Sequence, residues 1–414
     1  MKRRVIVIGG GPAGMMAAIA AAENGCSALL IEANEKLGKK LYITGKGRCN
    51  LTNGCEREEF FKNIPRNPRF LMSGFSRLDN HALMQRFEDW GVPLVVERGE
   101  RVFPASGKAS DITRALSQQL VALGVEVRVN TRCTGLNIEN GAVCAVRTGR
   151  GTFPCDAAII ATGGVSYPLT GSTGDGYSFA EEAGHQVIPP RGSLVPLETE
   201  DEWKRPLQGL SLKNVELCAR KGKKLLYRER GEMMFTHFGI TGPLVLSLSA
   251  HLPEDLDGVE VWIDLKPALT EEQVAARLLR EIEGAQRRRL STILCELMPR
   301  SFAEVFGSIA GMDGATEGHQ ITREQRAALA RIVKHVPLRV SGARPVAEAV
   351  VTRGGVDVRG VEPATMRSKM VKGLHFAGEV LDVDAYTGGF NLQIAFTTGY
   401  AAGVAAARTE EETP

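Results

Sequence analysis

The hydrophobic pattern opens with a short apolar run, a glycine-rich break and a long stretch of small apolar residues. Arg4–Ile8 is rich in β-branched residues, which is typical of a strand buried on both faces of a parallel sheet. Residues 15–24 (MMAAIAAAEN) are strong helix formers, and this helix is expected to end at Gly25. Ser27–Ile31 is a second apolar run. The order strand, helix, strand predicts an α/β unit with a parallel sheet.

The middle of the chain has a different pattern from its two ends. A Pro/Gly-rich segment at 188–196 leads into short alternating strands at 212–230 and 259–267. Helices are then predicted at about 270–283, 286–298 and 322–335, before the chain returns over residues 340–358. Outside this middle part, the patterns predict a helix at 109–123, strands at 124–133, 157–164 and 374–379, and a long small-residue helix at 392–407. The middle part therefore reads as an insertion into an α/β domain.

Composition limits the classes of protein that this chain can be. With 414 residues, 43% hydrophobic residues and a net charge of +3, it is long enough for about two or three domains and needs no disulfides or metals for stability. The eight cysteines form no C-x-x-C pair and no Cys/His set, so we predict no metal site and reduced thiols in a cytoplasmic protein. The N-terminal apolar run is too short for a signal peptide, and no membrane span is expected.

The glycine-rich break has the form G-x-G-x-x-G between a predicted strand and a predicted helix. Gly9 allows the tight turn, Gly11 lets the backbone approach a pyrophosphate, and Gly14 lets helix and strand pack closely. Pro12 and Ala13 begin the helix, whose N-terminus offers free N–H groups and the positive end of its dipole. At the end of the second strand, Glu32 is placed to accept the hydroxyls of an adenosine ribose. These features together predict a dinucleotide site.

Four later segments favour FAD over NAD as the dinucleotide. A strand reaching Cys133 brings backbone groups to the adenine edge, and a Thr-Gly-Gly turn closes over the pyrophosphate. A Gly-acid strand end can bond the ribityl chain, and a helix N-terminus can stabilise negative charge on the flavin ring. The residues concerned are Cys133; Ala161, Thr162, Gly163 and Gly164; Gly378, Glu379 and Asp382; and Gly388, Gly389, Phe390, Asn391 and Leu392. No second G-x-G-x-x-G follows, so NAD(P)H is expected to dock transiently as electron donor.

Several longer motifs resemble the bacterial family described as aminoacetone-oxidase-like or YhiN-like NAD(P)/FAD-dependent oxidoreductases. They are GKKLYITGKGRCNLTN (38–53), ERVFPASGKASD (100–111), ATGGVSYPLTGSTGDGYSFAEEAGH (161–185), FTHFGITGP (235–243) and GLHFAGEVLDVDAYTGGFNLQIAF (373–396). A more distant similarity is to the flavoprotein subunits of succinate dehydrogenase and fumarate reductase. The resemblance implies an α/β fold in which residues 1–190 and 341–414 form a Rossmann-type FAD-binding domain. The insert, 191–340, is implied to have a β-barrel-like part (191–268) and a helical part (269–340).

The resemblance also implies reductive chemistry. Members of the family reduce bile-acid dehydro-intermediates or convert a uridine of large-subunit ribosomal RNA to dihydrouridine, and both reactions saturate an activated C=C bond. Such a reaction needs hydride from flavin N5 and a proton from a positioned acid. Candidate catalytic residues are Arg48 and Cys49, in the glycine-rich loop, and His237, because histidine is a common proton donor in enzymes. The loop region is also implied to hold the cofactor, through Ala33, Lys39, Lys40, Gly47, Arg48, Cys49 and Asn50.

Less specific interpretations of these residues stay open. Cys49 can be a buried residue of a loop that only wraps the cofactor, and a lone histidine such as His237 is more often structural. Residues 204–230 hold nine Lys/Arg against two acids, a local basic patch that suits an RNA substrate or simply a solvated strand face. Arg287–Arg289 adds a second basic cluster. The alternatives to an RNA reductase are a small-molecule enoyl or steroid-like reductase, an amine oxidase, and an RNA-associated protein in which FAD is structural.

Overall fold

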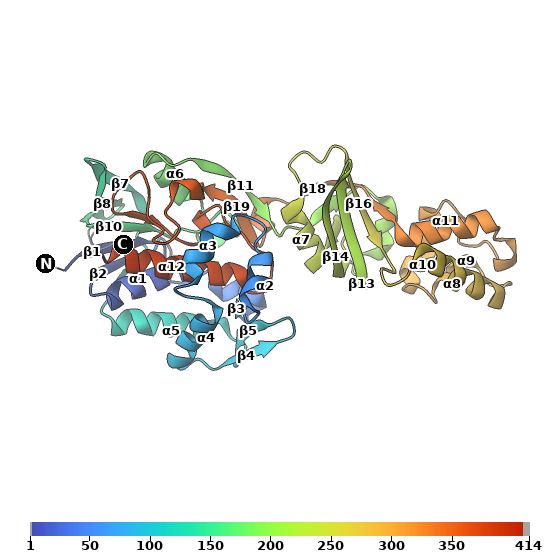
Figure 1. The fold of residues 1–414 in the computed structure, drawn as a ribbon, viewed down its shortest axis with the longest axis horizontal. Helices are drawn as coiled ribbons and strands as arrows, with labels where there is room; N and C mark the ends of the chain where they lie inside the picture. The colour runs from blue at the N-terminus through green and yellow to red at the C-terminus, as the bar shows by residue number, and fades with distance from the viewer. Residues whose placement is uncertain (1, 409–414) are drawn as a thin grey trace. The chain divides into compact units, whose positions relative to one another are not determined.

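The computed structural model describes residues 2–408, and the chain folds as two compact units. Unit 1 contains Met1–Ser193 and Val346–Pro414, and unit 2 contains Leu194–Pro345. Each unit has its own hydrophobic core. The chain therefore leaves the first unit once, builds the second, and returns (Figure 1).

A five-stranded parallel sheet forms the centre of unit 1. Its order is β20-β10-β1-β2-β6, and every neighbouring pair is parallel. The strands are β1 (Arg4–Ile8), β2 (Ser27–Ile31), β6 (Glu126–Arg128), β10 (Ala157–Ile160) and β20 (Leu374–Phe376). The bounds of β1 and β2 are those predicted from the sequence. The strand predicted at 124–133 is wrong over its second half, because residues 130 and 131 leave the sheet and donate their N–H groups to the carbonyls of Asn34 and Glu32.

Two helices of small residues pack against each other beside this sheet. They are α1 (Pro12–Glu23) and α12 (Phe390–Ala406), which lie side by side in Figure 1. A Cβ on Gly399 would lie 2.2 Å from the carbonyl oxygen of Ala13, and one on Gly403 would lie 2.2 Å from that of Ala17. Glycine at both positions is therefore what lets the helix backbones approach so closely.

The remaining elements of unit 1 surround this core. Two three-stranded antiparallel sheets have the orders β3-β5-β4 and β7-β8-β9, and β11 pairs with β19. Their bounds are Thr52–Asn53 (β3), Leu94–Glu97 (β4), Arg101–Pro104 (β5), Cys133–Glu139 (β7), Ala142–Thr148 (β8), Gly151–Pro154 (β9), Val187–Ser193 (β11) and Val351–Val356 (β19). The helices are Arg57–Lys62 (α2), Pro68–Phe75 (α3), Asn80–Asp89 (α4), Ala109–Ala122 (α5) and Asp175–Glu182 (α6), and α5 agrees with the predicted helix.

Unit 2 combines an antiparallel sheet with a group of helices. Its sheet has the order β17-β16-β13-β14-β15-β12-β18. The strands are Leu197–Thr199 (β12), Ser211–Lys221 (β13), Lys224–Phe235 (β14), Gly239–Thr241 (β15), Val259–Asp264 (β16), Val336–Leu338 (β17) and Val340–Ala343 (β18). The helices are Pro243–His251 (α7), Glu271–Gly284 (α8), Leu290–Leu294 (α9), Arg300–Ile309 (α10) and Arg323–Lys334 (α11).

The helical part of unit 2 departs from the prediction at one place. The helix predicted at 286–298 is wrong, because Arg288 and Arg289 leave the helical path and bond through their backbones to residues 317–318. Only the short α9 forms there, and α10 was not predicted. The predicted helices at 270–283 and 322–335 correspond to α8 and α11, each of which begins with a Thr-Gln capping box.

Candidate functional site

A cavity of about 360 Å³ opens at the carboxyl ends of the parallel strands of unit 1. Its wall is built from the segments that follow β1, β2, β10 and β20, together with the start of α12, and all its lining residues belong to unit 1. The carboxyl ends of parallel strands are where open α/β sheets bind their ligands, and the volume lies in the range of small-molecule sites.

The glycine turn after β1 is shaped to receive an anionic group. Gly9 has a φ of +108°, and a Cβ on it would lie 2.4 Å from the carbonyl oxygen of Ala161. A Cβ on Gly14 would lie 1.8 Å from the Gly9 carbonyl oxygen, so Gly14 is required for packing, as predicted. Gly11 differs from both, because apart from Gly11 and its two chain neighbours no heavy atom of residues 2–408 lies within 4 Å of its Cβ position. Backbone at Gly11 and the first turn of α1 therefore face open space, where a pyrophosphate can accept the free N–H groups.

Glu32 marks one end of the cavity. Its Oε2 accepts a hydrogen bond from the Gly10 N–H at 2.7 Å, and its Oε1 accepts two from the backbone and side chain of Asn34, each at 2.7 Å. These bonds hold the carboxylate in one orientation, and Oε2 keeps a second lone pair. Glu32 is therefore fixed at the end of β2, where a ribose hydroxyl can reach it.

The N-terminus of α12 lies on another part of the wall. Gly388 and Gly389 have φ of +129° and +100°, and a Cβ on Gly389 would meet the Thr52 backbone at 2.3 Å. Asn391 and Leu392 follow in the first helical turn and line the cavity, so their N–H groups lack intrahelical acceptors. The side chain of Asn391 bonds the backbone of Ala385 and thereby fixes the loop that leads into the helix.

A cluster of charged and hydroxyl groups completes the site. Lys40 Nζ lies 2.7 Å from Glu379 Oε2 and 2.6 Å from Ser166 Oγ. Glu379 Oε1 accepts hydrogen bonds from Ser166 Oγ at 3.1 Å and from the Thr352 N–H at 2.8 Å. Burial raises the pKa of Glu379, but the charge of Lys40 and the hydrogen bonds from Lys40 and Thr352 outweigh it, so this pKa lies below its ordinary value.

The structure brings most of the predicted cofactor residues to this one cavity. Those that line it are Gly9, Gly11, Pro12, Ala13, Glu32, Ala33, Lys39, Lys40, Asn50, Cys133, Ala161, Thr162, Gly163, Gly378, Glu379, Gly388, Gly389, Asn391 and Leu392. Among the described residues, Asn50 Oδ1 and Thr162 Oγ1 are buried without a hydrogen-bond partner. This wall fits a bound flavin dinucleotide. It has open space beside Gly11, the N-termini of two helices, and the Asn50 amide oxygen, which is buried without a hydrogen-bond donor in the described part of the chain.

Comparison with known proteins places the chain in a family. A family model described as HI0933-like protein Rossmann domain matches residues 3–405. The chain belongs to this HI0933-like family. Relatives are the 3-dehydro-bile acid delta(4,6)-reductase of Clostridium scindens (30% identity, 98% of this chain and 99% of the relative) and the ribosomal RNA dihydrouridine synthase of Haemophilus influenzae (30%, 97% and 98%).

A solved structure supports the same fold. The 3-ketosteroid-delta4-(5alpha)-dehydrogenase of Rhodococcus jostii aligns with a TM-score of 0.52 and 16% identity, over 98% of this chain and 97% of that one. The fold is thus the Rossmann-type FAD-binding fold of flavoprotein oxidoreductases, and this HI0933-like chain is an FAD-dependent oxidoreductase. Within residues 2–408, no helix has the length and apolar character needed to cross a membrane.

Cys49, the acid predicted in the glycine-rich loop, lies away from the cavity. Cys49 is completely buried and does not line the cavity, and burial raises the pKa of its thiol to about 12. Arg48 pairs with Glu97, its Nη2 lying 2.6 Å from Oε1, and stacks on the Phe103 ring at 4.3 Å. Gly47 is also outside the wall. This placement does not support cofactor or catalytic roles for these three residues, because packing and a local ion pair occupy them.

Three other predicted cofactor residues also serve packing. Asp382 accepts hydrogen bonds from Asn67 and from the Gly354 N–H, and Arg66 lies nearby, so its carboxylate is used inside the protein. Phe390 packs edge-on against Phe60 at 5.1 Å. A Cβ on Gly164 would lie 2.2 Å from Thr352 Oγ1. Asp382, Phe390 and Gly164 are absent from the cavity wall.

His237 lies in unit 2, where its ring meets Phe238 edge-on at 5.0 Å. Every residue of the cavity wall belongs to unit 1, so a catalytic role for His237 stays a prediction.

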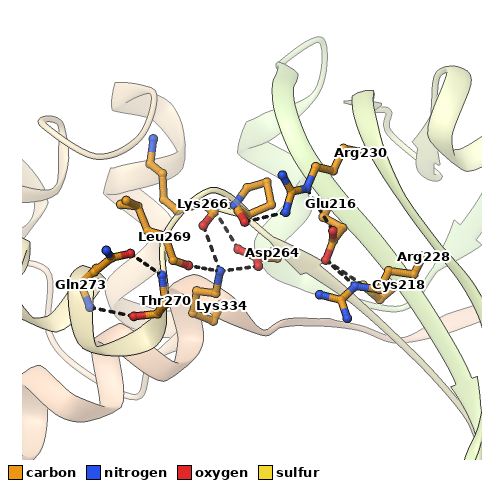
Figure 2. Close-up of polar contacts among 11 residues, drawn as sticks. Glu216, Cys218, Arg228, Arg230, Asp264, Lys266, Leu269, Thr270, Gln273 and Lys334 are labelled. Carbon is orange, nitrogen blue, oxygen red and sulfur yellow. Dashed lines mark hydrogen bonds and ion pairs between the residues drawn. The ribbon is translucent and has the colours of Figure 1, made fainter.

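The basic patch at 204–230 is largely neutralised by acids, most of which lie outside it in sequence. Arg228 and Arg230 both bond Glu216, as Figure 2 shows, at 2.8 and 3.2 Å. Lys204 is buried and donates to the Thr199 carbonyl. The other ion pairs of the patch are Arg205 with Glu202, Arg220 with Glu260, and Lys221 with Asp255. Within the described part of the chain, Lys213, Lys223 and Lys224 keep no such partner.

Sequence reasoning missed two residues of the cluster around Lys40. Ser166 lies in the family motif 161–185, but nothing in the sequence around it indicates that its hydroxyl contacts Lys40. Thr352 lies in the segment where the chain returns from unit 2, and its Oγ1 accepts hydrogen bonds from the N–H groups of Val165 and Ser166. Only the three-dimensional arrangement joins these positions, because they are far apart in sequence.

Proposed function

We propose that this protein reduces an activated C=C bond with electrons from NAD(P)H, and that its substrate is uridine in ribosomal RNA. The observation that carries the proposal is the cavity of unit 1, which combines a pyrophosphate turn, a ribose acceptor and a second helix N-terminus in one wall. Two relatives that share the whole length of the chain are named for reductions that saturate a ring, one of a bile acid and one of ribosomal uridine.

In this proposal the residues of the cavity wall bind and orient the cofactor and stabilise charge on its ring system. The first turn of α1 holds the pyrophosphate, and Glu32 holds the ribose at the adenosine end. The N–H groups at the start of α12 stabilise negative charge on the ring system. A bound flavin would supply the hydride that one carbon of the C=C bond takes up. Because Cys49 is buried outside the wall, the proton for the other carbon comes from another acid, and His237 is the candidate that we retain.

The arginine triplet Arg287–Arg289 is the better candidate for an RNA contact. Its three side chains are exposed, and none forms an ion pair within residues 2–408. Their backbone is held in place, because the Gly318 N–H donates to the Arg288 carbonyl and Arg289 bridges Glu317. Three exposed guanidinium groups suit phosphate binding, whereas most of the 204–230 patch already has carboxylate partners.

The proposal is tested by nucleoside mass spectrometry of ribosomal RNA from cells with and without the gene. We expect one dihydrouridine to be lost on deletion, restored by the intact gene, and not restored by Gly11→Val. The matched pair Arg287→Ala/Arg288→Ala/Arg289→Ala and Lys213→Ala/Lys223→Ala/Lys224→Ala, assayed on purified RNA at two salt concentrations, separates the two basic surfaces. We expect only the arginine variant to raise the KM for RNA strongly and to reduce its salt dependence.

An unchanged dihydrouridine content would refute the RNA substrate. The second candidate is a small cyclic enone, which is favoured by the bile-acid reductase that matches at the same identity. NADPH- or NADH-dependent loss of enone absorbance with purified protein would support it. If neither NADPH nor NADH bleaches the flavin under anaerobic conditions, both forms of the proposal are refuted.

A further inference from the structure

The proposed reaction assigns no role to the ion pair of Lys40 and Glu379 or to the hydroxyl groups around it. Both residues line the cavity, and both are largely buried, with about a fifth of each side chain exposed. Glu379 uses both oxygens for protein donors: Oε2 for Lys40, and Oε1 for Ser166 and the Thr352 N–H. Lys40 uses two of its three N–H bonds, for Glu379 and Ser166. One N–H of Lys40 is therefore left for a group in the cavity.

The cluster lies at the flavin end of the cavity. Glu32 follows β2 and Glu379 follows β20, and the sheet order places β1 and β10 between those strands. Three strand spacings of about 4.8 Å separate the two carboxylates by roughly 14 Å along the sheet edge. The pyrophosphate turn follows β1, between them. A dinucleotide with its adenosine ribose at Glu32 therefore carries its ribityl chain and ring system toward Lys40.

The pair is held rigidly. Thr352 Oγ1 accepts hydrogen bonds from the Val165 and Ser166 N–H groups at 2.8 and 3.2 Å, so the segments carrying Ser166 and Thr352 are tied together. A Cβ on Gly164 would lie 2.8 Å from Glu379 Oε1, so the carboxylate packs directly against this backbone. Because three protein donors hold the carboxylate in place, it has little freedom to turn toward a ligand.

We infer that Lys40 donates its remaining N–H to the bound flavin, where the ribityl chain joins the ring system. Glu379 is a positioning residue: it holds the Lys40 ammonium in place and offsets the positive charge of Lys40. Together the two residues set the reduction potential of the flavin. Reduction adds negative charge to the ring system, which a nearby ammonium stabilises and a nearby carboxylate destabilises. The two charges therefore act on the potential in opposite directions.

The test is the midpoint potential of purified holoenzyme, measured by anaerobic dye equilibration at pH 7. We expect Lys40→Met to lower the potential and Glu379→Gln to raise it, each by at least about tenfold in the equilibrium constant, which is about 30 mV for a two-electron couple. The double variant should return close to the wild-type value, and Lys40→Arg, which keeps the charge, should stay there. Ser166→Ala removes a hydrogen bond without changing the charge and should shift the potential least.

Shifts of the same sign in the two single variants, or a double variant that shifts further than either, would overturn the inference. If Glu379→Gln does not fold, the comparison of Lys40→Met with Lys40→Arg decides alone, and equal potentials in those two variants would refute it. The measurement uses neither RNA nor an enone. A failed search for dihydrouridine therefore leaves this inference intact, and a failed potential shift leaves the substrate proposal intact.

Discussion

Substitution of Gly11 by alanine separates cofactor binding from folding more cleanly than any other change in the glycine turn. Gly11 has φ −77° and ψ −177°, which any residue adopts, and no described heavy atom beyond its chain neighbours lies within 4 Å of the Cβ position. The new methyl group costs the apoprotein nothing in packing, and the loss of a glycine should change its free energy of unfolding by about +0.4 to +1 kcal/mol. The methyl group instead occupies space that a pyrophosphate needs.

The effect on FAD should be large. A displaced pyrophosphate loses one or two hydrogen bonds from the first turn of α1, each worth about 1.5–3 kcal/mol when the acceptor is charged. The dissociation constant should then rise by about 10- to 150-fold for each lost bond. Isothermal titration of the apoprotein with FAD measures this, and urea unfolding of the same apoprotein measures stability.

Gly14→Ala is the matched control. Its Cβ would lie 1.8 Å from the Gly9 carbonyl oxygen, so α1 must shift away from the turn. This variant should lose about 3 kcal/mol or more of stability, through overpacking. Wild-type FAD affinity in Gly11→Ala, or equal destabilisation of the two apoproteins, would show that the assignment of the open side of the turn is mistaken.

Three further outcomes are expected. Burial lowers the pKa of His375 to about 4, below the ordinary value near 6.5, so its contribution to stability is fully present above pH 6.5 and is lost as pH falls toward 4. In urea titrations of His375→Gln, about 2 kcal/mol of the stability that the wild type loses between pH 7 and 5 should be retained. An unchanged pH dependence of stability in this variant would contradict the prediction. Cys49→Ala should keep the pH profile of flavin reoxidation by substrate, whereas loss of the decline at high pH would restore Cys49 as a proton donor. Gly403→Ala should lower the unfolding free energy by about 2 kcal/mol, since its Cβ would meet the Ala17 carbonyl at 2.2 Å, and a neutral effect would mean that α12 can shift freely.

The nucleotide-binding part of the fold could be predicted because its signals are local. The strand, the glycine turn and the helix that follow one another from Arg4 to Glu23 each have a pattern that packing reinforces. The same holds for the N-terminus of α12, where two glycines with positive φ precede a run of small residues. Most of the cofactor residues predicted from motifs of this kind line the cavity, because each motif contributes consecutive residues at a strand end.

The direction of side chains could not be predicted in the same way. Arg48 and Cys49 lie in a motif whose neighbour Asn50 reaches the cavity, yet one turns to Glu97 and the other into the core. The number of unpaired charges in the 204–230 patch could not be predicted for a related reason, since Glu260 joins Arg220 only across the pairing of β13 with β16. Such partners depend on how distant strands pair, and counting charges along a segment of the sequence does not reveal that pairing.

The position of β20 and α12 in the sheet has a consequence for how the protein is made. Both elements come after residue 373 of 414, yet β20 forms one edge of the sheet and α12 covers the apolar surface of α1. During synthesis the N-terminal strands and α1 emerge first, and unit 2, with its own core, can fold before their partners exist. The nucleotide site therefore stays incomplete until β20 and α12 have been synthesised, so the cavity that would hold the cofactor forms only after both chain segments of unit 1 and all of unit 2 have been made.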